Sequence, residues 1–176
     1  GTGDLAIAML KSNPEKVIGI DISKGMLEVG RKKMKDKGLE DRISLKQADS
    51  ENMPFEDNTF DAVTVSFGAR NFENLEKGLS EMCRVMRPGG KLYILEFSQP
   101  TIFPFKQIYQ FYFKYILPLV GKMVSKDNVA YTYLPESVGA FPYGSKLNNI
   151  IEECGYSNAS SHPLTMGIAT IYIAEK

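Results

Sequence analysis

Two glycines and two acids are the residues of this sequence whose types and spacing most clearly suit ligand chemistry. Gly1 and Gly3 form a turn that leads into a stretch with helical spacing, so a ligand can approach the backbone and meet the N–H groups of a helix start. Asp21 and Asp49 each end a short stretch with a strand pattern, and Ser50 follows the second acid. Carboxylates in such positions accept hydrogen bonds from ribose hydroxyls or from an adenine amino group. The pattern predicts a cofactor that contains a nucleoside.

Two cofactors of this kind are compatible with the glycine turn. The G-x-G-x-x-A spacing of residues 1–6 matches the dinucleotide-binding fingerprint, which is a weak signal when it stands alone. Asp4 discriminates between the two cofactors, because a carboxylate in the first helical turn would repel the pyrophosphate of a dinucleotide and attract the sulfonium of S-adenosylmethionine. We therefore favour S-adenosylmethionine over a nicotinamide dinucleotide. Two structural alternatives stay open, in which Asp49 caps a helix and Asp21 serves only a turn.

The elements that must position these residues alternate between strands and helices. Residues 16–22 are apolar and β-branched, and the stretch after them has a helix cap at Ser23 and a helix-ending glycine at Gly38. Repeated alternation predicts right-handed crossovers and an open parallel sheet with ligands at the carboxyl ends of its strands. The nearly continuous apolar run at 60–67 predicts a strand buried on both faces. The other expected elements are strands at 43–49, 91–97, 156–164 and 167–176, the last two forming an antiparallel hairpin, and helices at 74–87 and 144–155.

The composition fits one globular domain over residues 1–176 and excludes some classes of partner. Hydrophobic residues make up 43% of the 176 residues, and 21 Lys and Arg balance 21 Asp and Glu. Without net charge or a basic stripe, nucleic acid is not an expected partner. Cys83 and Cys154 stand apart from any Cys or His cluster, so we expect no metal site and a reducing, cytoplasmic setting.

An aromatic segment interrupts the alternation at about residues 99–143. Five apolar and aromatic side chains with helical spacing predict a cap helix that packs on the sheet. The remaining aromatic residues suit a cover for a flat ring with an apolar tail, and both interpretations can hold together. Lys106, Lys114 and Lys122 would bring the segment near anionic lipid. The five stripe residues are Ile108, Phe111, Tyr112, Tyr115 and Ile116.

Several segments resemble the menaquinone/ubiquinone-biosynthesis C-methyltransferase family, a group of class I methyltransferases, over essentially the whole chain. "SFGARNF" and "RVMRPGGKLYILEFS" are specific to that family, whereas "GTGDL" and "IGIDISKGMLEVGRKKM" are shared by many methyltransferases. The resemblance implies an α/β, Rossmann-like sheet, mostly parallel with a C-terminal antiparallel hairpin, whose first strand is missing. It also implies cofactor contacts from Thr2, Asp21, Asp49, Ser50 and Ser66.

By this resemblance the chain would methylate a ring carbon of a polyprenylated quinol, most closely demethylmenaquinol. Such a carbon becomes a good nucleophile when the adjacent hydroxyl loses its proton, so the site needs a base or a cation near that oxygen. Arg70 and Asn71 follow the strand end at which substrate and cofactor meet in this fold. We expect Arg70 to stabilise the oxyanion, or to order a water that accepts the proton, and Asn71 to orient the ring. The alternative is a structural ion pair for Arg70 and a helix cap for Asn71.

Two other functions remain as alternatives. The chain could methylate another small acceptor, such as a benzoquinol precursor of ubiquinone, a sterol or a phenol, or it could be a non-catalytic scaffold that binds the cofactor. His162 is the only histidine and precedes Pro163 in a terminal strand, so we expect it at the surface and not as a general base.

The missing first strand leads to a further expectation, that the chain is an N-terminally truncated form. In the resembled fold that strand lies centrally, between the strands that end in Asp21 and Ser66. The two exposed edges should then close on each other or pair with a second chain, giving a homodimer. The glycine turn should lose its anchor and bind the cofactor weakly. The expected location is cytoplasmic, with peripheral contact at the inner face of the membrane.

Overall fold

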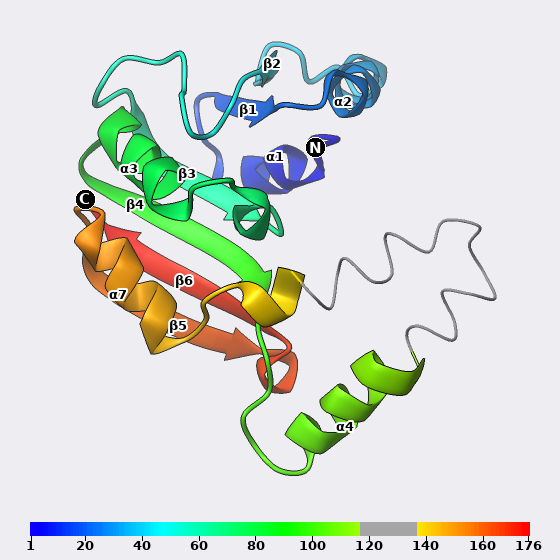
Figure 1. Ribbon diagram of the computed structural model, residues 1–176. Helices are drawn as coiled ribbons and strands as arrows, with labels where there is room; N and C mark the ends of the chain where they lie inside the picture. The colour runs from blue at the N-terminus through cyan, green and yellow to red at the C-terminus, as the bar shows by residue number, and fades with distance from the viewer. Residues whose placement is uncertain (117–136) are drawn as a thin grey trace. The chain divides into compact units, whose positions relative to one another are not determined.

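The computed structural model describes residues 1–116 and 137–176 of the chain (Figure 1). These residues divide into two compact units, Gly1–Glu56 and Asp57–Lys176, and each unit is described by itself. The expectation of one methyltransferase domain with an aromatic insert at about 99–143 stays a prediction. Residues 117–136, which include Lys122, lie outside the described part.

The first unit contains one strand–helix–strand crossover. Strands β1 (Val17–Asp21) and β2 (Ile43–Gln47) pair in parallel, and α2 (Lys24–Asp36) connects them. The hydroxyl of Ser23 caps α2 by accepting from the Met26 N–H, and Gly38 follows the helix with a φ of 63°, as the sequence predicts. The remaining elements are α1 (Asp4–Met9) and the 3-10 turn η1 (Leu10–Ser12).

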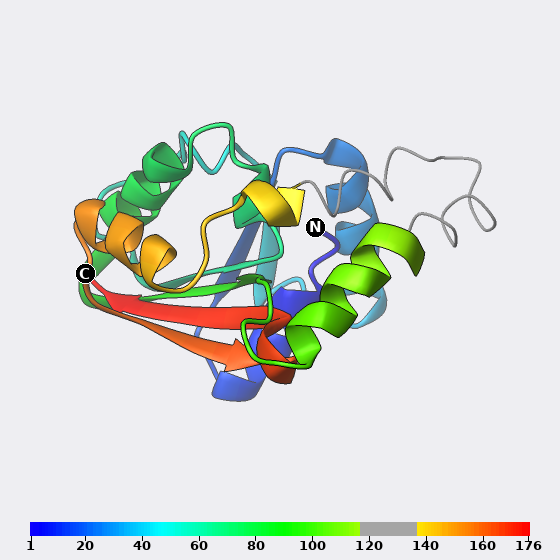
Figure 2. The same cartoon turned by 60° about the horizontal axis from the view of Figure 1, so that its bottom comes forward.

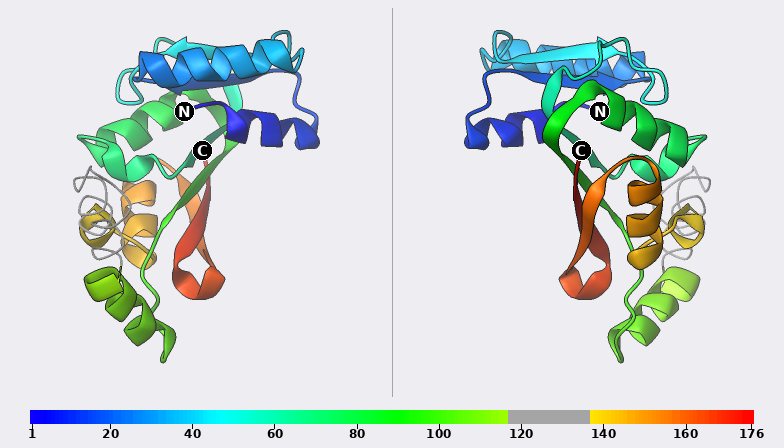
Figure 3. Two further views of the ribbon diagram at one scale, coloured as in Figure 1. Left: turned by 90° about the vertical axis from the view of Figure 1, so that its right-hand side faces the viewer. Right: turned by 90° about the vertical axis from the view of Figure 1, so that its left-hand side faces the viewer.

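The core of this unit lies between α2 and its two strands, and Figure 3 shows α2 running alongside them. Leu27 and Met34 on the helix pack with Val17, Ile43 and Leu45 on the strands. The glycine turn joins this packing at Gly30, where an added Cβ would lie 2.5 Å from Leu45 Cδ1 and 3.2 Å from the backbone of Thr2. The close approach of α2 to the turn therefore requires a glycine at position 30.

The second unit is a four-stranded sheet with strand order β3-β4-β6-β5. Strands β3 and β4 form a second parallel crossover, and β4, β6 and β5 pair antiparallel, which confirms the predicted hairpin. The strands are β3 (Phe60–Ser66), β4 (Met86–Phe97), β5 (Ser157–Leu164) and β6 (Ala169–Glu175). The helices and short turns are η2 (Ala69–Asn71), α3 (Leu75–Val85), α4 (Phe105–Phe111), η3 (Tyr112–Ile116), α7 (Ser145–Glu153) and η4 (Thr165–Gly167).

Helices α3 and α7 cover the same face of this sheet (Figure 2). The Cys83 thiol donates to the Gly155 carbonyl at 3.7 Å, and the buried Tyr156 hydroxyl donates to the Leu79 carbonyl at 3.0 Å. These contacts join the two helical segments directly. Apolar side chains of α3, α7 and β4 form the fully buried core beneath them: Leu79, Val85, Met86, Leu92, Ile94, Leu147 and Ile151.

Two expectations about burial are wrong. Strand β3 is half-buried along most of its length and exposed at Asp61 and Ala62, because it is an edge strand whose one described partner is β4. The predicted stripe on α4 and η3 does not pack on the sheet, since Ile108 is 60% exposed and Phe111 is 58% exposed. The half-buried rings of this helix are instead those of Tyr109 and Phe113, which stack with their centroids 4.2 Å apart.

Burial raises the pKa of the Tyr109 hydroxyl to about 12. Its oxygen has no hydrogen-bond partner among the described residues.

None of the helices in the described part of the chain is long and apolar enough to cross a membrane.

The expectation that two exposed strand edges close on each other is also wrong. Strands β1 and β3 belong to separate sheets and share no ladder. Thr2 and Gly3 pack against α2 and β2 within the first unit, and the expectation that the glycine turn lacks its preceding strand and binds the cofactor weakly stays a prediction. Pairing of these edges with a second chain stays a prediction.

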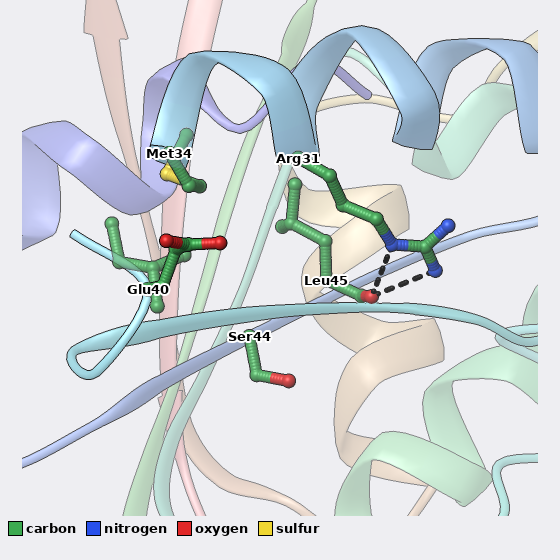
Figure 4. Close-up of a pocket in the computed structure, with 6 residues that line it drawn as sticks. Arg31, Met34, Glu40, Ser44 and Leu45 are labelled. Atoms are coloured by element: carbon green, nitrogen blue, oxygen red, sulfur yellow. Dashed lines mark hydrogen bonds between the residues drawn. The ribbon is translucent and has the colours of Figure 1, made fainter. Parts of the chain in front are cut away.

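A small pocket of the first unit lies between α2 and β2 (Figure 4). It has a volume of about 180 Å³ and is lined by side chains that include Arg31, Met34, Glu40 and Ser44. The Arg31 guanidinium donates to the Leu45 carbonyl through Nε at 3.2 Å and Nη2 at 2.9 Å. The predicted cofactor-binding residues do not line this pocket.

The two glycines of α2 provide a matched test of the packing against the glycine turn. We expect Gly30→Ala to lower the free energy of unfolding by about 1–3 kcal/mol, because its Cβ would overlap Leu45 and press on Thr2. Gly25 has open space around it, so Gly25→Ala should raise stability by about 0.5 kcal/mol through the higher helix propensity of alanine. Urea unfolding measures both values. Equal stability of the two variants would show that the turn does not pack on α2.

Candidate functional site

The glycine turn is shaped by its own backbone and by α2. Gly3 precedes α1 with a φ of 80°, a conformation that favours glycine, and its carbonyl accepts from the Ile7 N–H at 3.0 Å. A Cβ at Gly3 would lie 2.8 Å from Met34 Cε. At Gly1 an added Cβ would find its nearest neighbour, Asp21 Oδ2, at 4.0 Å. Gly3 is therefore explained by local packing, whereas Gly1 leaves room beside the acid.

Asp21 lies at the carboxyl end of β1 and faces the glycine turn. Its Oδ1 accepts from the Ser23 N–H at 2.7 Å, and its Oδ2 faces Gly1. Partial burial opposes ionisation of this carboxyl, and the hydrogen bond from the Ser23 N–H favours it. Asp21 thus forms the turn that one alternative predicted, and it also places a carboxylate oxygen beside Gly1.

Asp49 and Ser50 follow β2, the parallel neighbour of β1. The Ala48 N–H donates to the Asp21 carbonyl at 3.2 Å, so the chain segments that carry the two acids are joined directly. Asp49 Oδ1 accepts from the Glu51 N–H at 2.8 Å in a turn. No helix begins at this point of the described chain, so the helix-capping alternative for Asp49 is wrong.

Asp4 carries less uncompensated charge than the sequence argument assumed. Its two oxygens accept from Lys33 Nζ at 2.8 and 2.7 Å, and Thr2 Oγ1 donates to it at 2.7 Å. The hydrogen bond from Lys33, followed by that from Thr2, lowers the pKa of the Asp4 carboxyl. Lys33 therefore offsets the charge on which we based the preference for a sulfonium.

The second unit holds the other predicted site residues, Ser66, Arg70 and Asn71. Ser66 is half-buried at the carboxyl end of β3. Phe67 follows it with a φ of 53°, an uncommon conformation for an aromatic residue that marks a local backbone constraint. Arg70 and Asn71 then form the short turn η2. The structure thus groups Gly1–Gly3 with Asp21, Asp49 and Ser50 in one unit and Ser66, Arg70 and Asn71 in the other.

Arg70 forms the buried ion pair that the structural alternative predicted. Its Nη1 donates to Glu96 Oε1 at 2.7 Å and to the Phe67 carbonyl at 2.7 Å. The guanidinium carbon also lies 5.2 Å from the centroid of the Phe97 ring. The helix cap predicted for Asn71 is provided instead by Asn74, whose side chain accepts from the Lys77 N–H at 2.9 Å.

Glu96 is the residue near this group that the sequence analysis missed. It sits in β4 with 0% of its surface exposed and accepts hydrogen bonds from the Arg70 side chain, the Arg70 N–H and the Phe97 N–H. The available signal was an acid inside the apolar run "KLYILEF", which requires a partner if it is buried. His162, by contrast, is exposed on β5, at the opposite edge of the sheet from β3, as expected.

The comparisons with known proteins agree on the fold and the family. The model of the ubiE/COQ5 methyltransferase family matches residues 1–176. A solved SAM-dependent methyltransferase from Aquifex aeolicus has a TM-score of 0.68 with 19% identity, over 99% of this chain and 77% of that chain. At this identity the likeness shows the fold alone, a class I methyltransferase sheet of the α/β type.

Two relatives are much closer in sequence. The demethylmenaquinone methyltransferase of Bacteroides fragilis is 51% identical over 100% of this chain and 72% of its own length. The ubiquinone/menaquinone biosynthesis C-methyltransferase UbiE of Geotalea daltonii is 43% identical over 100% of this chain and 75% of its own length. With a family match over the whole chain and relatives at this identity, the chain belongs to the ubiE/COQ5 methyltransferase family.

Proposed function

We propose that the chain catalyses the S-adenosylmethionine-dependent C-methylation of a polyprenylated quinol in quinone biosynthesis, with demethylmenaquinol converted to menaquinol. The observation that carries this proposal is the 51% identity, along the full chain, to the demethylmenaquinone methyltransferase of Bacteroides fragilis. No alternative acceptor and no non-catalytic scaffold is better supported than this reaction. The site residues named below are our assignment.

The first unit fits the cofactor by the chemistry of its donors and acceptors. Asp21 offers a carboxylate oxygen next to the open side of Gly1, which suits ribose hydroxyls, and Asp49 with Ser50 suits the adenine amino group. Thr2 and Gly3 complete the turn, and Ser66 is assigned from the second unit. When bound, S-adenosylmethionine supplies an activated methyl group on a sulfonium.

The chemistry left to the protein is to make a ring carbon nucleophilic and to hold the ring. Loss of the proton from the adjacent hydroxyl gives a phenolate, which places electron density on the carbon. A guanidinium has donors and no acceptor, so Arg70 can stabilise this oxygen or order a water that takes the proton. Asn71 is exposed beside Arg70 and is assigned to orienting the ring.

The proposal includes a cytoplasmic location, peripheral contact with the inner face of the membrane and a homodimer. The contact is supported by exposed apolar side chains on and before α4, such as Ile102, Phe103 and Ile108, with the exposed Lys106 among them. Such contact would give the enzyme access to a substrate whose apolar polyprenyl tail lies in the membrane.

The substrate is tested by incubating the enzyme with methyl-labelled cofactor and, separately, demethylmenaquinol, the benzoquinol precursor of ubiquinone, a sterol and a phenol. We expect label on a ring carbon of menaquinol, located by mass spectrometry. Label on another acceptor alone would identify the alternative methyltransferase. Cofactor binding without transfer to any acceptor would favour the scaffold.

Asp21→Ala tests the ribose contact. Loss of two hydrogen bonds to a charged acceptor should weaken S-adenosylmethionine binding by about 1–3 kcal/mol in calorimetry. Asp41→Ala, which removes an exposed acid from the same unit, is the matched control and should leave affinity unchanged. Unchanged affinity in both variants would remove Asp21 from the site.

Arg70→Lys tests the role of the guanidinium. A compact ammonium cannot hold Glu96, the Phe67 carbonyl and a ring oxygen together, so turnover should fall about tenfold or more while cofactor affinity is kept. Steady-state rates and calorimetry measure the two quantities. Turnover equal to that of the wild type would leave Arg70 with a structural role only.

A further inference from the structure

The buried carboxylate of Glu96 controls both the backbone and the side chain of Arg70. Oε2 accepts from the Arg70 N–H at 3.3 Å, and Oε1 accepts from Arg70 Nη1 at 2.7 Å. The Phe97 N–H, at 2.9 Å from Oε1, fixes the carboxylate to its own strand. Glu96 therefore sets the position of the guanidinium relative to the end of β3.

Only part of the Arg70 guanidinium is used by these contacts. Both N–H groups of Nη1 are engaged, one by Glu96 and one by the Phe67 carbonyl. Nε is buried and has no hydrogen-bond partner among the described residues. A buried N–H donor normally has an acceptor, so this group calls for one that comes from a ligand.

The surroundings of this donor suit a flat aromatic ligand. The rings of Phe67 and Phe97 lie 4.5 Å apart between centroids, and Phe97 also faces the guanidinium. Phe67 is 37% exposed, and its backbone is held in the left-handed region with its carbonyl bound to Arg70. A partly exposed aromatic ring thus lies against the ring that faces the guanidinium.

A purely structural ion pair explains these features less well. Glu96 is fully buried and the Arg70 side chain is 11% exposed; burial of such a pair is costly, and two apolar side chains would fill the same space at least as favourably. An ion pair stabilises the fold most when every buried donor has a hydrogen-bond acceptor, whereas here the Nε–H of Arg70 has none among the described residues. The pair is better explained if function requires the Arg70 guanidinium to be held in one position.

We propose that Glu96 is a positioning residue for methyl transfer, which holds Arg70 so that its Nε–H remains available to the oxygen of the acceptor ring. This inference rests on the proposed function, since it acts through Arg70. Glu96 itself does not touch the substrate. Its contribution is to fix the guanidinium and the adjoining Phe67 backbone.

A double-variant cycle tests the proposal with Glu96→Gln, Arg70→Lys and the double variant. Glu96→Gln should lower kcat about tenfold or more while the Kd for S-adenosylmethionine stays within about twofold. In the Arg70→Lys background the same change should lower kcat by less than about twofold, because its effect passes through Arg70. A fall of equal size in both backgrounds, or a folded Glu96→Gln enzyme with wild-type kcat, overturns the proposal. Glu153→Gln, an exposed acid on α7, is the control for loss of charge.

Glu96→Gln leaves a buried charge without its partner, so a second measurement uses the unmodified enzyme. In nitrogen-15 spectra of the wild type, the Arg70 Nε–H resonance is identified by its loss in Arg70→Lys. We expect it to shift when an unreactive quinone analogue is added with S-adenosylhomocysteine. A resonance that does not move while the analogue binds overturns the proposal. Failure of the proposed function is separate, because it appears as absent methylation of every quinol by the wild type.

Discussion

Parallel pairing of strands that are joined through a helix is the constraint on which the candidate site depends. In each unit the two strands of a crossover run in the same direction, so their carboxyl ends fall at one edge. Asp21 and Asp49 meet in this way after β1 and β2. In the second unit Ser66 pairs with Leu95, which sets Glu96 beside the turn that begins at Phe67. The contact between Glu96 and Arg70 is a direct result of that register.

The sequence predicts the order and type of most elements, because strong local signals mark them. The cap at Ser23, the glycine at position 38 and the alternation of apolar runs each correspond to an observed boundary. Burial was predicted less well. An apolar run indicates a strand but not its number of neighbours, so the edge position of β3 could not be read from residues 60–67. The stripe on α4 was likewise assigned a partner that local periodicity does not specify.

The candidate site was predicted where its residues follow strand ends and missed where it depends on tertiary contact. Asp21 was found because an acid directly after an apolar strand is a local pattern. Glu96 was missed because its role comes from Arg70, 26 positions away in the chain. The same reasoning applies to Asn71 and Asn74, since both are plausible caps by sequence and only the start of α3 decides between them. The charge argument at Asp4 favoured the cofactor that the family uses, but it left out Lys33, which lies 29 positions away and donates to the carboxylate.

The Arg31 guanidinium on the Leu45 carbonyl bears on the behaviour of the protein in concentrated solution. Within the described residues β2 has β1 as its one neighbouring strand, and strands with an unpaired side are the places where chains add to one another and aggregate. Arg31 occupies a backbone acceptor of this strand with two donors and adds a positive charge there. We therefore expect Arg31 to hinder the addition of a second chain along β2, so that α2 contributes to solubility as well as to packing.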